Sequence, residues 1–473
     1  MFERIKRLNF KTVRHNLVIA AFDGKNNFGD LDELFGGKFS KRIKKGQISS
    51  KVGEVTAVTI FEKINTEVIY FVGMGKPSEL DFSKVRKSFS KLGKTIEKGS
   101  IVVLDSFLNK KVELSEMAEL IAETITISRY KFDDMKSKKV EKEDFDILFN
   151  CKVDYSSEFA KGMILGEATN NARSLVNTPH NHLNAEGIAE YAMNLASENQ
   201  LEIKIYDKDE IVKMKMGAFL AVNQGSLVPT KLIVIKYQGK KVWDNPVALV
   251  GKGLMFDSGG YNLKSNSKNM KTDMAGSATV LGAIEAISKL KLDENIMMVI
   301  AATDNMIGKE AFLPDDVITA ANGKTIEIFS TDAEGRLTLA DALWFAQQEG
   351  AKRIIDVATL TGSIVAALGG AYVGAFTNNT PFLRKLKNVA KMTTEPIWHM
   401  PIGPHFKKSI KGKIADINNG GVRLGGASAA AAFLEEFIEK GTKWIHLDIA
   451  GSASKAETGA TGIMVRTLTK LFE

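Results

Sequence analysis

Residues 246–303 read PVALVGKGLMFDSGGYNLKSNSKNMKTDMAGSATVLGAIEAISKLKLDENIMMVIAAT. The two ends of this segment, 246–251 and 295–303, are almost continuously apolar, as strands buried on both faces of a sheet must be. Between them, residues 275–290 repeat apolar side chains at the spacing of a helix. Strand, helix and strand in this order indicate an α/β fold with a mostly parallel sheet.

The same alternation continues on both sides of this segment. Further strand-like runs, also nearly continuous in apolar character and expected to be buried on both faces, are 201–207, 231–237, 325–331, 353–360 and 444–451. Further helical patterns are 185–200, 337–350 and 428–441. We therefore expect a larger C-terminal domain, residues 165–473, with a mostly parallel central sheet covered by helices on both faces. In such a sheet, ligands bind at the loops that leave the carboxyl ends of the strands.

The N-terminal part is a smaller α/β domain by the same criteria. Its strand-like runs, 16–22, 55–62, 68–75 and 100–107, are separated by polar, Lys-rich connections. We place this domain at residues 1–150. The highly charged segment 131–146 is interpreted as a solvated linker or exposed hairpin near the domain boundary.

Composition excludes several classes of protein. A formal net charge of +8 is modest for 473 residues, and a solvated basic surface explains it more readily than nucleic-acid binding. The single cysteine, Cys151, cannot form an intramolecular disulfide or a cysteine-based zinc site. Because no apolar run reaches the length of a membrane span or a signal-peptide core, we expect a soluble, cytoplasmic protein.

Common catalytic motifs are also missing. The sequence contains neither a phosphate-binding G-x-x-x-x-G-K-[ST] loop nor the G-x-S-x-G motif of serine hydrolases. Only six histidines are present, and none forms an H-E-x-x-H motif. The spacing of His180 and His182 would permit chelation, but we interpret both as residues of a solvated loop.

Two acidic loops, 251–276 and 330–336, carry the remaining chemistry. Each follows a predicted strand and precedes a predicted helix, and together they hold Lys252, Asp257, Lys264, Asp273, Asp332, Glu334 and Arg336. In extended backbone, the spacing of Asp332 and Glu334 points both carboxylates the same way, and Arg336 continues that face.

If the two loops meet at one edge of the sheet, four carboxylates converge. Four negative charges in a partly buried cleft require a counter-charge, because neighbouring carboxylates raise one another's pKa. Two divalent cations would balance them, so the pattern favours a dinuclear metal site. An alternative is that each acid only caps the helix that follows it.

The second loop resembles a known signature. STDAEGRLTLADAL (330–343) is similar to N-T-D-A-E-G-R-L-x-L-A-D-A-L of the leucyl aminopeptidases, also called cytosol aminopeptidases, with Ser330 in place of Asn. Further similar segments, in the same order, are 250–260, 270–276 and 356–362, and more loosely 171–179 and 216–226. The resemblance covers about residues 165–473.

This family consists of dinuclear metallo-exopeptidases, so the resemblance implies two divalent metal ions per subunit. Their ligands would be Lys252, Asp257, Asp273 and Glu334 for one metal and Asp257, Asp332 and Glu334 for the other. We expect Mn²⁺ or Zn²⁺, with Mg²⁺ and Co²⁺ as alternatives.

The resemblance also implies a reaction. Water activated by the two metals would hydrolyse the peptide bond that follows an N-terminal residue, with apolar, Leu-like residues preferred. Lys264 and Arg336 would be catalytic, the first polarising the carbonyl and the second holding a bicarbonate that moves the proton. Substrate contacts would come from Lys264, Asp273, Met270, Thr359, Leu360 and Gly362, near Ala450 and Gly451.

The sequence departs from the family pattern between Lys264 and Asp273, where the interval is two residues shorter and Ser265 replaces a proline. The resemblance further implies a homohexamer acting on peptides. Two alternatives remain: an architectural DNA-binding protein, for which no recognition motif is visible, and a dipeptidase of the Cys-Gly type on the same fold. The intact Lys264, Arg336 and ligand set argue against a catalytically inactive scaffold.

Overall fold

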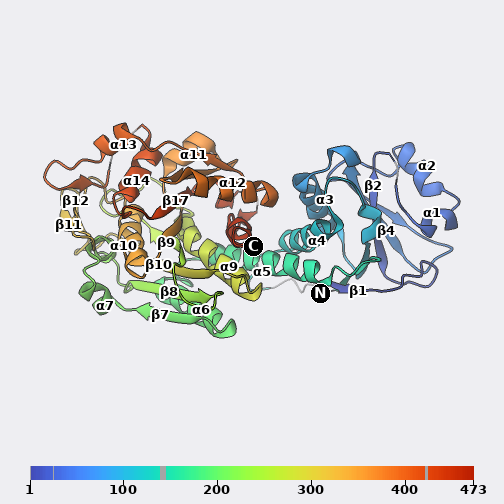
Figure 1. Ribbon diagram of the computed structural model, residues 1–473, viewed down its shortest axis with the longest axis horizontal. Helices are drawn as coiled ribbons and strands as arrows, with labels where there is room; N and C mark the ends of the chain where they lie inside the picture. Colours follow the sequence, from blue (N-terminus) through green and yellow to red (C-terminus); the bar gives the residue numbers. More distant parts are fainter. Residues whose placement is uncertain (1, 25, 139–144, 421–423, 457) are drawn as a thin grey trace. The chain divides into compact units, whose positions relative to one another are not determined.

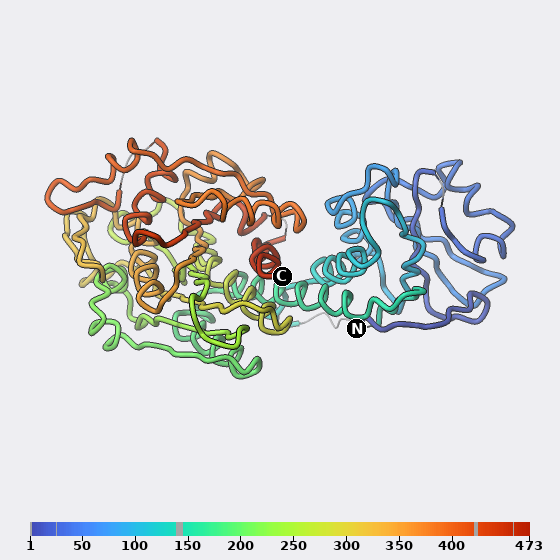
Figure 2. Tube along the Cα trace, viewed as in Figure 1, coloured from blue at the N-terminus to red at the C-terminus, as the bar shows by residue number. Residues whose placement is uncertain are grey.

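The computed structural model describes residues 2–24, 26–138, 145–420, 424–456 and 458–473 (Figure 1). The chain divides into two compact units, Met1–Asn170 and Asn171–Glu473. Each unit is built from one continuous stretch of chain, as the colours in Figure 2 show. The division falls inside one long helix, α5 (Ser156–Asn177).

The N-terminal unit is built on a six-stranded sheet. In spatial order its strands are β1 (Phe2–Arg4), β6 (Ile147–Asn150), β5 (Ser100–Val103), β2 (Asn16–Phe22), β4 (Val68–Gly75) and β3 (Val55–Thr59). All neighbours are parallel except β3 and β4. The strands predicted at 16–22 and 68–75 have these bounds, whereas those at 55–62 and 100–107 end earlier.

Helices and short helical turns complete this unit. They are α1 (Asp30–Leu34), α2 (Lys38–Lys44), η1 (Pro77–Glu79), α3 (Phe82–Thr95), η2 (Leu104–Phe107) and α4 (Leu114–Ser128). The charged segment 131–146 continues from α4 as irregular chain over residues 131–138. Its residues 139–144 lie outside the described part of the chain, so the linker or hairpin interpretation stays a prediction.

The C-terminal unit is built on an eight-stranded sheet. In spatial order its strands are β15 (Ile397–His399), β14 (Val373–Thr377), β17 (Lys443–Asp448), β13 (Arg353–Ala358), β9 (Val247–Asp257), β10 (Asn295–Asn305), β8 (Lys231–Gln238) and β7 (Glu202–Tyr206). The central strands β17, β13, β9 and β10 are parallel. The predicted α/β class with a mostly parallel sheet is confirmed.

Antiparallel pairs flank this parallel centre, between β14 and β17 on one side and among β10, β8 and β7 on the other. The apolar pattern of a buried strand does not reveal its direction, which is why the sequence missed these pairs. The edge strand β7 is partly exposed along its length, so the expectation that 201–207 is buried on both faces was wrong.

Helices cover both faces of this sheet (Figure 1). On one face, α8, α10 and α14 share a core cluster with alternate strand residues such as Val250. The next residue, Gly251, points to the other face, where a Cβ atom would lie 2.7 Å from the Ser277 Cα atom in α9. The helices of this unit are α6 (Ala185–Glu198), α7 (Lys208–Lys213), α8 (Gly217–Asn223), α9 (Ala275–Lys289), α10 (Gly335–Gln348), α11 (Gly362–Leu368), α12 (Thr380–Thr393), α13 (Pro404–Ser409), α14 (Gly426–Glu435) and α15 (Val465–Lys470).

One predicted strand of the main sheet lies elsewhere. Residues 325–331 form only β12 (Thr325–Glu327), which pairs with β11 (Val317–Thr319) and β16 (Ile417–Asn418) in a separate small sheet. Ile326 and Ile328 are buried, whereas Phe329 is exposed. Burial therefore alternates with a period of two, which suits a small sheet with one covered face. The strands β18 (Ser454–Lys455) and β19 (Gly459–Ala460) form another small pair.

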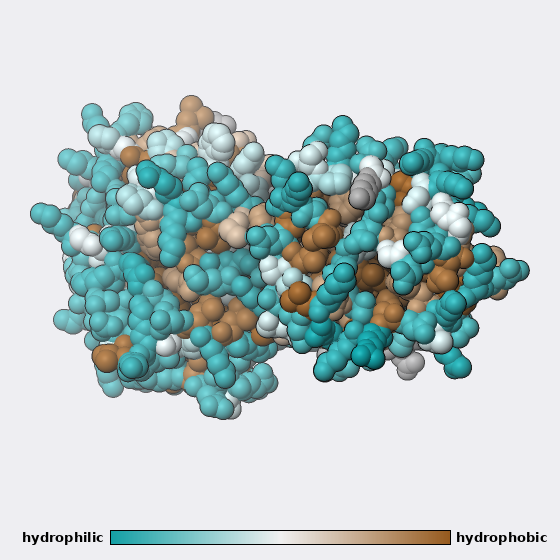
Figure 3. Space-filling view, turned by 45° about the vertical axis from the view of Figure 1, so that its right-hand side comes forward, coloured by the Kyte–Doolittle hydropathy of each residue, from teal (hydrophilic) through white to brown (hydrophobic). Residues whose placement is uncertain are grey.

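The surface seen in Figure 3 is mostly hydrophilic, with smaller hydrophobic patches between the polar side chains. Within the described residues, no helix combines the length and the apolar character needed to cross a bilayer.

Candidate metal centre

The strand β9 supplies the first two residues of the site. Lys252 lies within this strand and Asp257 is its last residue, so the strand extends beyond the predicted end at residue 251. Both side chains are buried. Asp257 is held from two sides, because its Oδ1 atom accepts hydrogen bonds from Asn305 Nδ2 at 2.8 Å and from the Gly259 N–H at 2.9 Å.

Asp273 reaches the same edge of the sheet from another segment. It lies in a turn of 3-10 helix, η3 (Met270–Met274), that leads directly into α9. Its Oδ1 atom accepts a hydrogen bond from the Thr359 hydroxyl at 2.8 Å, and Thr359 follows the neighbouring strand β13. Asp273 is therefore fixed by a contact across the sheet.

Asp332 and Glu334 come from the turn before α10. Glu334 has helical backbone angles and neither residue lies in extended chain, so the argument from extended spacing was wrong. The turn into the helix brings the carboxylates together instead. No side chain caps α9 or α10, and the capping alternative is therefore wrong for Asp273 and Glu334.

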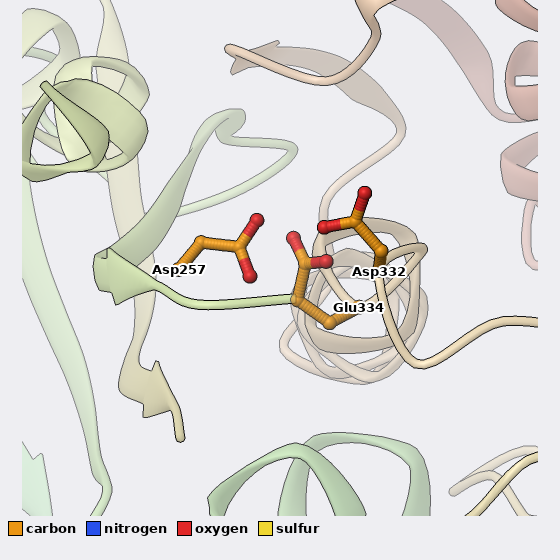
Figure 4. Close-up of side chains that lie close together, drawn as sticks. All are labelled: Asp257, Asp332 and Glu334. Carbon is orange, nitrogen blue, oxygen red and sulfur yellow. The ribbon is translucent and has the colours of Figure 1, made fainter. Parts of the chain in front are cut away.

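Three of the carboxylates form one compact group. One oxygen from each of Asp257, Asp332 and Glu334 lies within 4.8 Å of the others. Figure 4 shows the three side chains pointing toward one another, Asp257 from the end of its strand and the other two from the chain entering the helix. Asp257 and Glu334 are buried, whereas Asp332 is exposed on the solvent side.

Two lysines lie among the carboxylates. Lys252 Nζ is 2.7 Å from Asp273 Oδ2 and 3.2 Å from Glu334 Oε1. Lys264 Nζ is 2.7 Å from Asp257 Oδ2 and 2.5 Å from Asp332 Oδ1. All five predicted metal ligands and the predicted catalytic lysine are thus brought together.

The electrostatics of this group are dominated by its carboxylates. Burial raises the pKa of Asp273 and of Glu334, and neighbouring carboxylates add to the rise. Burial alone would lower the pKa of Lys252 and Lys264, but the carboxylates outweigh it and raise both values above the usual range.

This donor set fits divalent cations. Four carboxylates against two ammonium groups leave a net negative charge at a largely buried position. In addition, Glu334 Oε2 is buried and has no hydrogen-bond partner. A cation would satisfy both the excess charge and the unpaired oxygen, and carboxylate oxygens with one amine suit the metals named above.

Gly335 sets the position of the buried lysine. A Cβ atom at this first residue of α10 would lie 2.4 Å from Lys252 Cε and 2.6 Å from Lys252 Nζ. The helix can therefore start directly against the lysine only because residue 335 has no side chain. Sequence analysis missed this contact, although the glycine stands within the quoted signature.

Arg336 is held by backbone carbonyl groups of another loop. Its guanidinium is buried, and the NH1 group donates to the carbonyl oxygens of Asn419 at 2.7 Å and Gly420 at 3.0 Å. Burial lowers the pKa of Arg336 to about 10, although Glu334 and Asp448 oppose this shift. The Nε atom of the same side chain is buried without a hydrogen-bond partner.

Among the predicted substrate residues, Thr359 contacts the acidic group directly. Thr359 is buried and its carbonyl oxygen accepts a hydrogen bond from Lys252 Nζ at 3.0 Å. Leu360 and Met270 are partly buried. Gly362 is exposed, and a Cβ atom there would have no heavy atom within 4 Å outside the adjoining chain. A cavity of about 360 Å³ lies elsewhere in the unit, between α5 and α6, and none of these residues lines it.

Two of the three departures from the family pattern make local hydrogen bonds. The Ser330 hydroxyl accepts a hydrogen bond from the Asp332 N–H at 3.2 Å, next to the acidic group. In the shortened loop, the Lys264 N–H donates to the Ser258 carbonyl at 3.0 Å, which anchors the start of the loop.

The interpretation of His180 as a solvated loop residue was wrong. Its Nε2 atom lies 3.0 Å from Asp304 Oδ1, and its ring packs edge-on against Phe256. His182 is exposed. The contact with Asp304 could not be predicted from sequence spacing, because the two residues are 124 positions apart in the chain.

Comparison with known proteins agrees with this geometry. The model of the cytosol aminopeptidase family, catalytic domain, matches residues 170–469, and that of the N-terminal domain of the same family matches residues 18–139. The chain belongs to the cytosol aminopeptidase family. The resemblance expected from the signature is confirmed, and the protein is a peptide-bond hydrolase of a metal-dependent family.

Similar proteins extend over nearly the whole chain. The probable cytosol aminopeptidase of Bacillus licheniformis is 41% identical over 481 residues, covering 97% of each chain. That of Bacillus subtilis strain 168 is 41% identical over 478 residues, covering 97% of this chain and 95% of its own. Among solved structures, the bottromycin maturation enzyme BotP superposes with a TM-score of 0.86 at 27% identity, covering 97% and 99% of the two chains.

Proposed function

We propose that this family member is a two-metal aminopeptidase that removes an apolar, Leu-like residue from the N-terminus of peptides. The observation that carries the proposal is the convergence of Asp257, Asp273, Asp332 and Glu334 around two lysine ammonium groups. Family membership supports the reaction class, and the excess negative charge supports the binding of divalent cations.

The metal ligands would be those implied by the sequence. Lys252, Asp257, Asp273 and Glu334 would hold one ion, and Asp257, Asp332 and Glu334 would hold the other, with Mn²⁺ or Zn²⁺ expected and Mg²⁺ or Co²⁺ as alternatives. Lys252 would bind as a neutral amine, because an adjacent dication lowers the pKa of the ammonium group that the carboxylates alone raise. When bound, such ions lower the pKa of water and stabilise negative charge on a substrate oxygen.

The side chains of the protein would divide the remaining work. Lys264 stays cationic because Asp257 and Asp332 flank it, so its ammonium group can donate to the carbonyl oxygen of the substrate and stabilise the charge that develops there. Asp273 would accept a hydrogen bond from the free α-amine of the substrate. Recognition of that amine would restrict cleavage to chain ends.

Arg336 would hold a small anion rather than act as a base. With a pKa of about 10 it keeps its proton near neutral pH. Its buried Nε donor has no hydrogen-bond partner, which supports binding of bicarbonate at this position.

Met270, Thr359, Leu360 and Gly362 would contact the N-terminal residue of the substrate. Leu360 packs against the apolar core cluster, and the position of a Cβ atom at Gly362 is open space. An apolar wall next to open space favours a Leu-like side chain. We also propose a homohexamer and a cytosolic location, the latter supported by the names of the related proteins.

Hydrolysis of leucyl-p-nitroanilide tests the proposal. Activity should disappear after treatment with a chelator and return with Mn²⁺ or Zn²⁺, whereas inactivity with every divalent metal would refute it. Glu334→Gln should abolish turnover while leaving the circular dichroism spectrum unchanged; near-normal activity would show that the ligand assignment is wrong.

Two further assays separate the alternatives. Much faster cleavage of Cys-Gly than of leucyl peptides would favour the dipeptidase. Tight DNA binding with a steep dependence on salt would favour the architectural protein, and no DNA binding at low salt would exclude it.

A further inference from the structure

Asp448 joins two loops that follow neighbouring parallel strands. It is the last residue of β17 and is almost completely buried. One of its oxygens, Oδ1, accepts hydrogen bonds from the Leu360 N–H at 3.1 Å and the Ala450 N–H at 3.2 Å. The other, Oδ2, accepts one from the Thr361 hydroxyl at 2.7 Å. A single carboxylate thus binds both loops.

The first loop, 359–362, is also bound to the acidic group. Thr359 contacts Lys252 through its carbonyl oxygen and Asp273 through its hydroxyl. The bonds to Asp448 follow at the next two residues. The course of the loop is therefore fixed on one side by proposed metal ligands and on the other by Asp448.

The second loop, 449–451, is fixed from outside by close backbone packing. A Cβ atom at Gly451 would lie 1.9 Å from the Gly369 carbonyl oxygen, so only glycine fits there. Between this contact and Asp448 stands Ala450. Ala450 and Leu360 are both partly buried and pack on the same apolar cluster, which makes them two sides of one wall.

The Thr361 hydroxyl requires a carboxylate, and not an amide, at residue 448. It accepts a hydrogen bond from the Ile364 N–H at 3.1 Å, capping α11, and at the same time donates to Asp448. An amide at residue 448 has only one acceptor oxygen. If that oxygen faces the two backbone N–H groups, its NH₂ group faces the Thr361 hydroxyl, and the donor of Thr361 loses its acceptor.

We propose that Asp448 is a positioning residue for substrate selectivity. It would act through Leu360 and Thr361, holding the wall that contacts the side chain of the N-terminal substrate residue. The inference rests on the proposed aminopeptidase function and adds to it a residue that touches neither the acidic group nor the substrate. A displaced wall weakens the contact with a large side chain more than with a small one.

The test compares leucyl- and alanyl-p-nitroanilide as substrates of the full-length, Mn²⁺-loaded protein. In Asp448→Asn, the ratio of kcat/KM for leucine to that for alanine should fall by about fivefold or more, chiefly through a higher KM for the leucyl substrate. Mn²⁺ affinity should stay near the wild-type value. A wild-type ratio in this variant would overturn the inference, as would equal losses for both substrates.

Thr361 provides a second route to the same measurement if Asp448→Asn does not fold. Thr361→Val keeps the shape but removes the hydroxyl, so the ratio should fall as well, whereas Thr361→Ser should preserve it. Equal ratios in all three proteins would overturn the inference.

A matched control is Asp341→Asn in α10. Asp341 is also a fully buried carboxylate. It accepts hydrogen bonds from the backbone N–H groups of Phe219 at 2.9 Å and Ala321 at 2.8 Å, but it contacts neither loop. Its substitution should leave the ratio of kcat/KM for the two substrates unchanged. A fall in this ratio would show that lost stability alone lowers it, and would overturn the inference. Inactivity of the wild-type protein on both substrates would instead refute the proposed function.

Discussion

Substitution of Gly335 by alanine should separate the stability of the fold from the function of the metal centre. The added methyl carbon would lie 2.4 Å from Lys252 Cε, whereas carbon atoms in contact are normally about 3.5–4.0 Å apart. The lysine end must therefore move by about 1 Å. Its Nζ atom would then leave its place between Asp273 and Glu334.

The displacement of Lys252 should change the stability of the fold only a little but lower the rate of the reaction strongly. The atoms displaced are the far end of a flexible side chain, and alanine in a helix is favoured over glycine by about 0.5–1 kcal/mol. The thermal midpoint should therefore change by only a few degrees. A misplacement of about 1 Å in an active site can lower turnover about 100-fold. We expect a loss of this order in kcat together with weaker Mn²⁺ binding.

The assay combines steady-state hydrolysis of leucyl-p-nitroanilide, calorimetric titration with Mn²⁺ and thermal unfolding. Gly187→Ala in α6 is the matched control, because its added methyl group would have no neighbour closer than 3.5 Å. It should behave like the wild type. Wild-type turnover and Mn²⁺ affinity in Gly335→Ala would refute the argument that this glycine positions Lys252.

Three other perturbations test separate parts of the structure. Lys264→Met should lower kcat about 100-fold or more with a smaller change in KM, because a donor to the developing negative charge is lost; steady-state kinetics in which only KM changes would contradict this role. Burial raises the pKa of Asp341 to about 7, so the folded state binds this proton more tightly than the unfolded state. Its contribution to the free energy of unfolding should therefore grow as the pH falls from about 7 towards 4, by at most about 1.4 kcal/mol per pH unit. Urea titrations of Asp341→Asn should lack this pH-dependent contribution. Equal pH slopes in both proteins would show that Asp341 does not titrate in this pH range. Finally, dialysis against a chelator should lower the thermal midpoint, since metal at 100 times its Kd stabilises the folded state by about 2.7 kcal/mol; an unchanged midpoint on adding Mn²⁺ back would argue against tight binding at this site.

The larger features of the fold were accessible from hydrophobic patterns. Buried strands such as Asn16–Phe22 and Val68–Gly75 have apolar runs with clear ends, and the turn residues around them mark those ends. Strand direction and sheet membership were not accessible. Residues 325–331 have the composition of a core strand, yet tertiary packing places them in a small sheet with one exposed face.

The structure brings the predicted ligands and Lys264 together, but partly for a local reason other than the one inferred from the sequence. Asp332 and Glu334 converge because the chain turns into α10, and not because it is extended. Other contributors lie too far away in the chain to be paired by spacing. Asn305 holds Asp257, and Asp448 holds the loop after β13, but neither has a sequence neighbour in the acidic loops.

The position of α5 bears on how the protein can be cut or recombined. The helix runs over Ser156–Asn177, while the division between the units falls after Asn170 and the match to the catalytic domain of the family begins at that same residue. A truncation there would leave residues 171–177 as a short helical stub without its first turns, and stubs of this length do not hold together in water. A gene fragment that encodes a self-sufficient hydrolase should therefore start upstream of Ser156. The same reasoning predicts that natural fusions in this family keep the whole helix with the catalytic unit when the amino-terminal unit is exchanged.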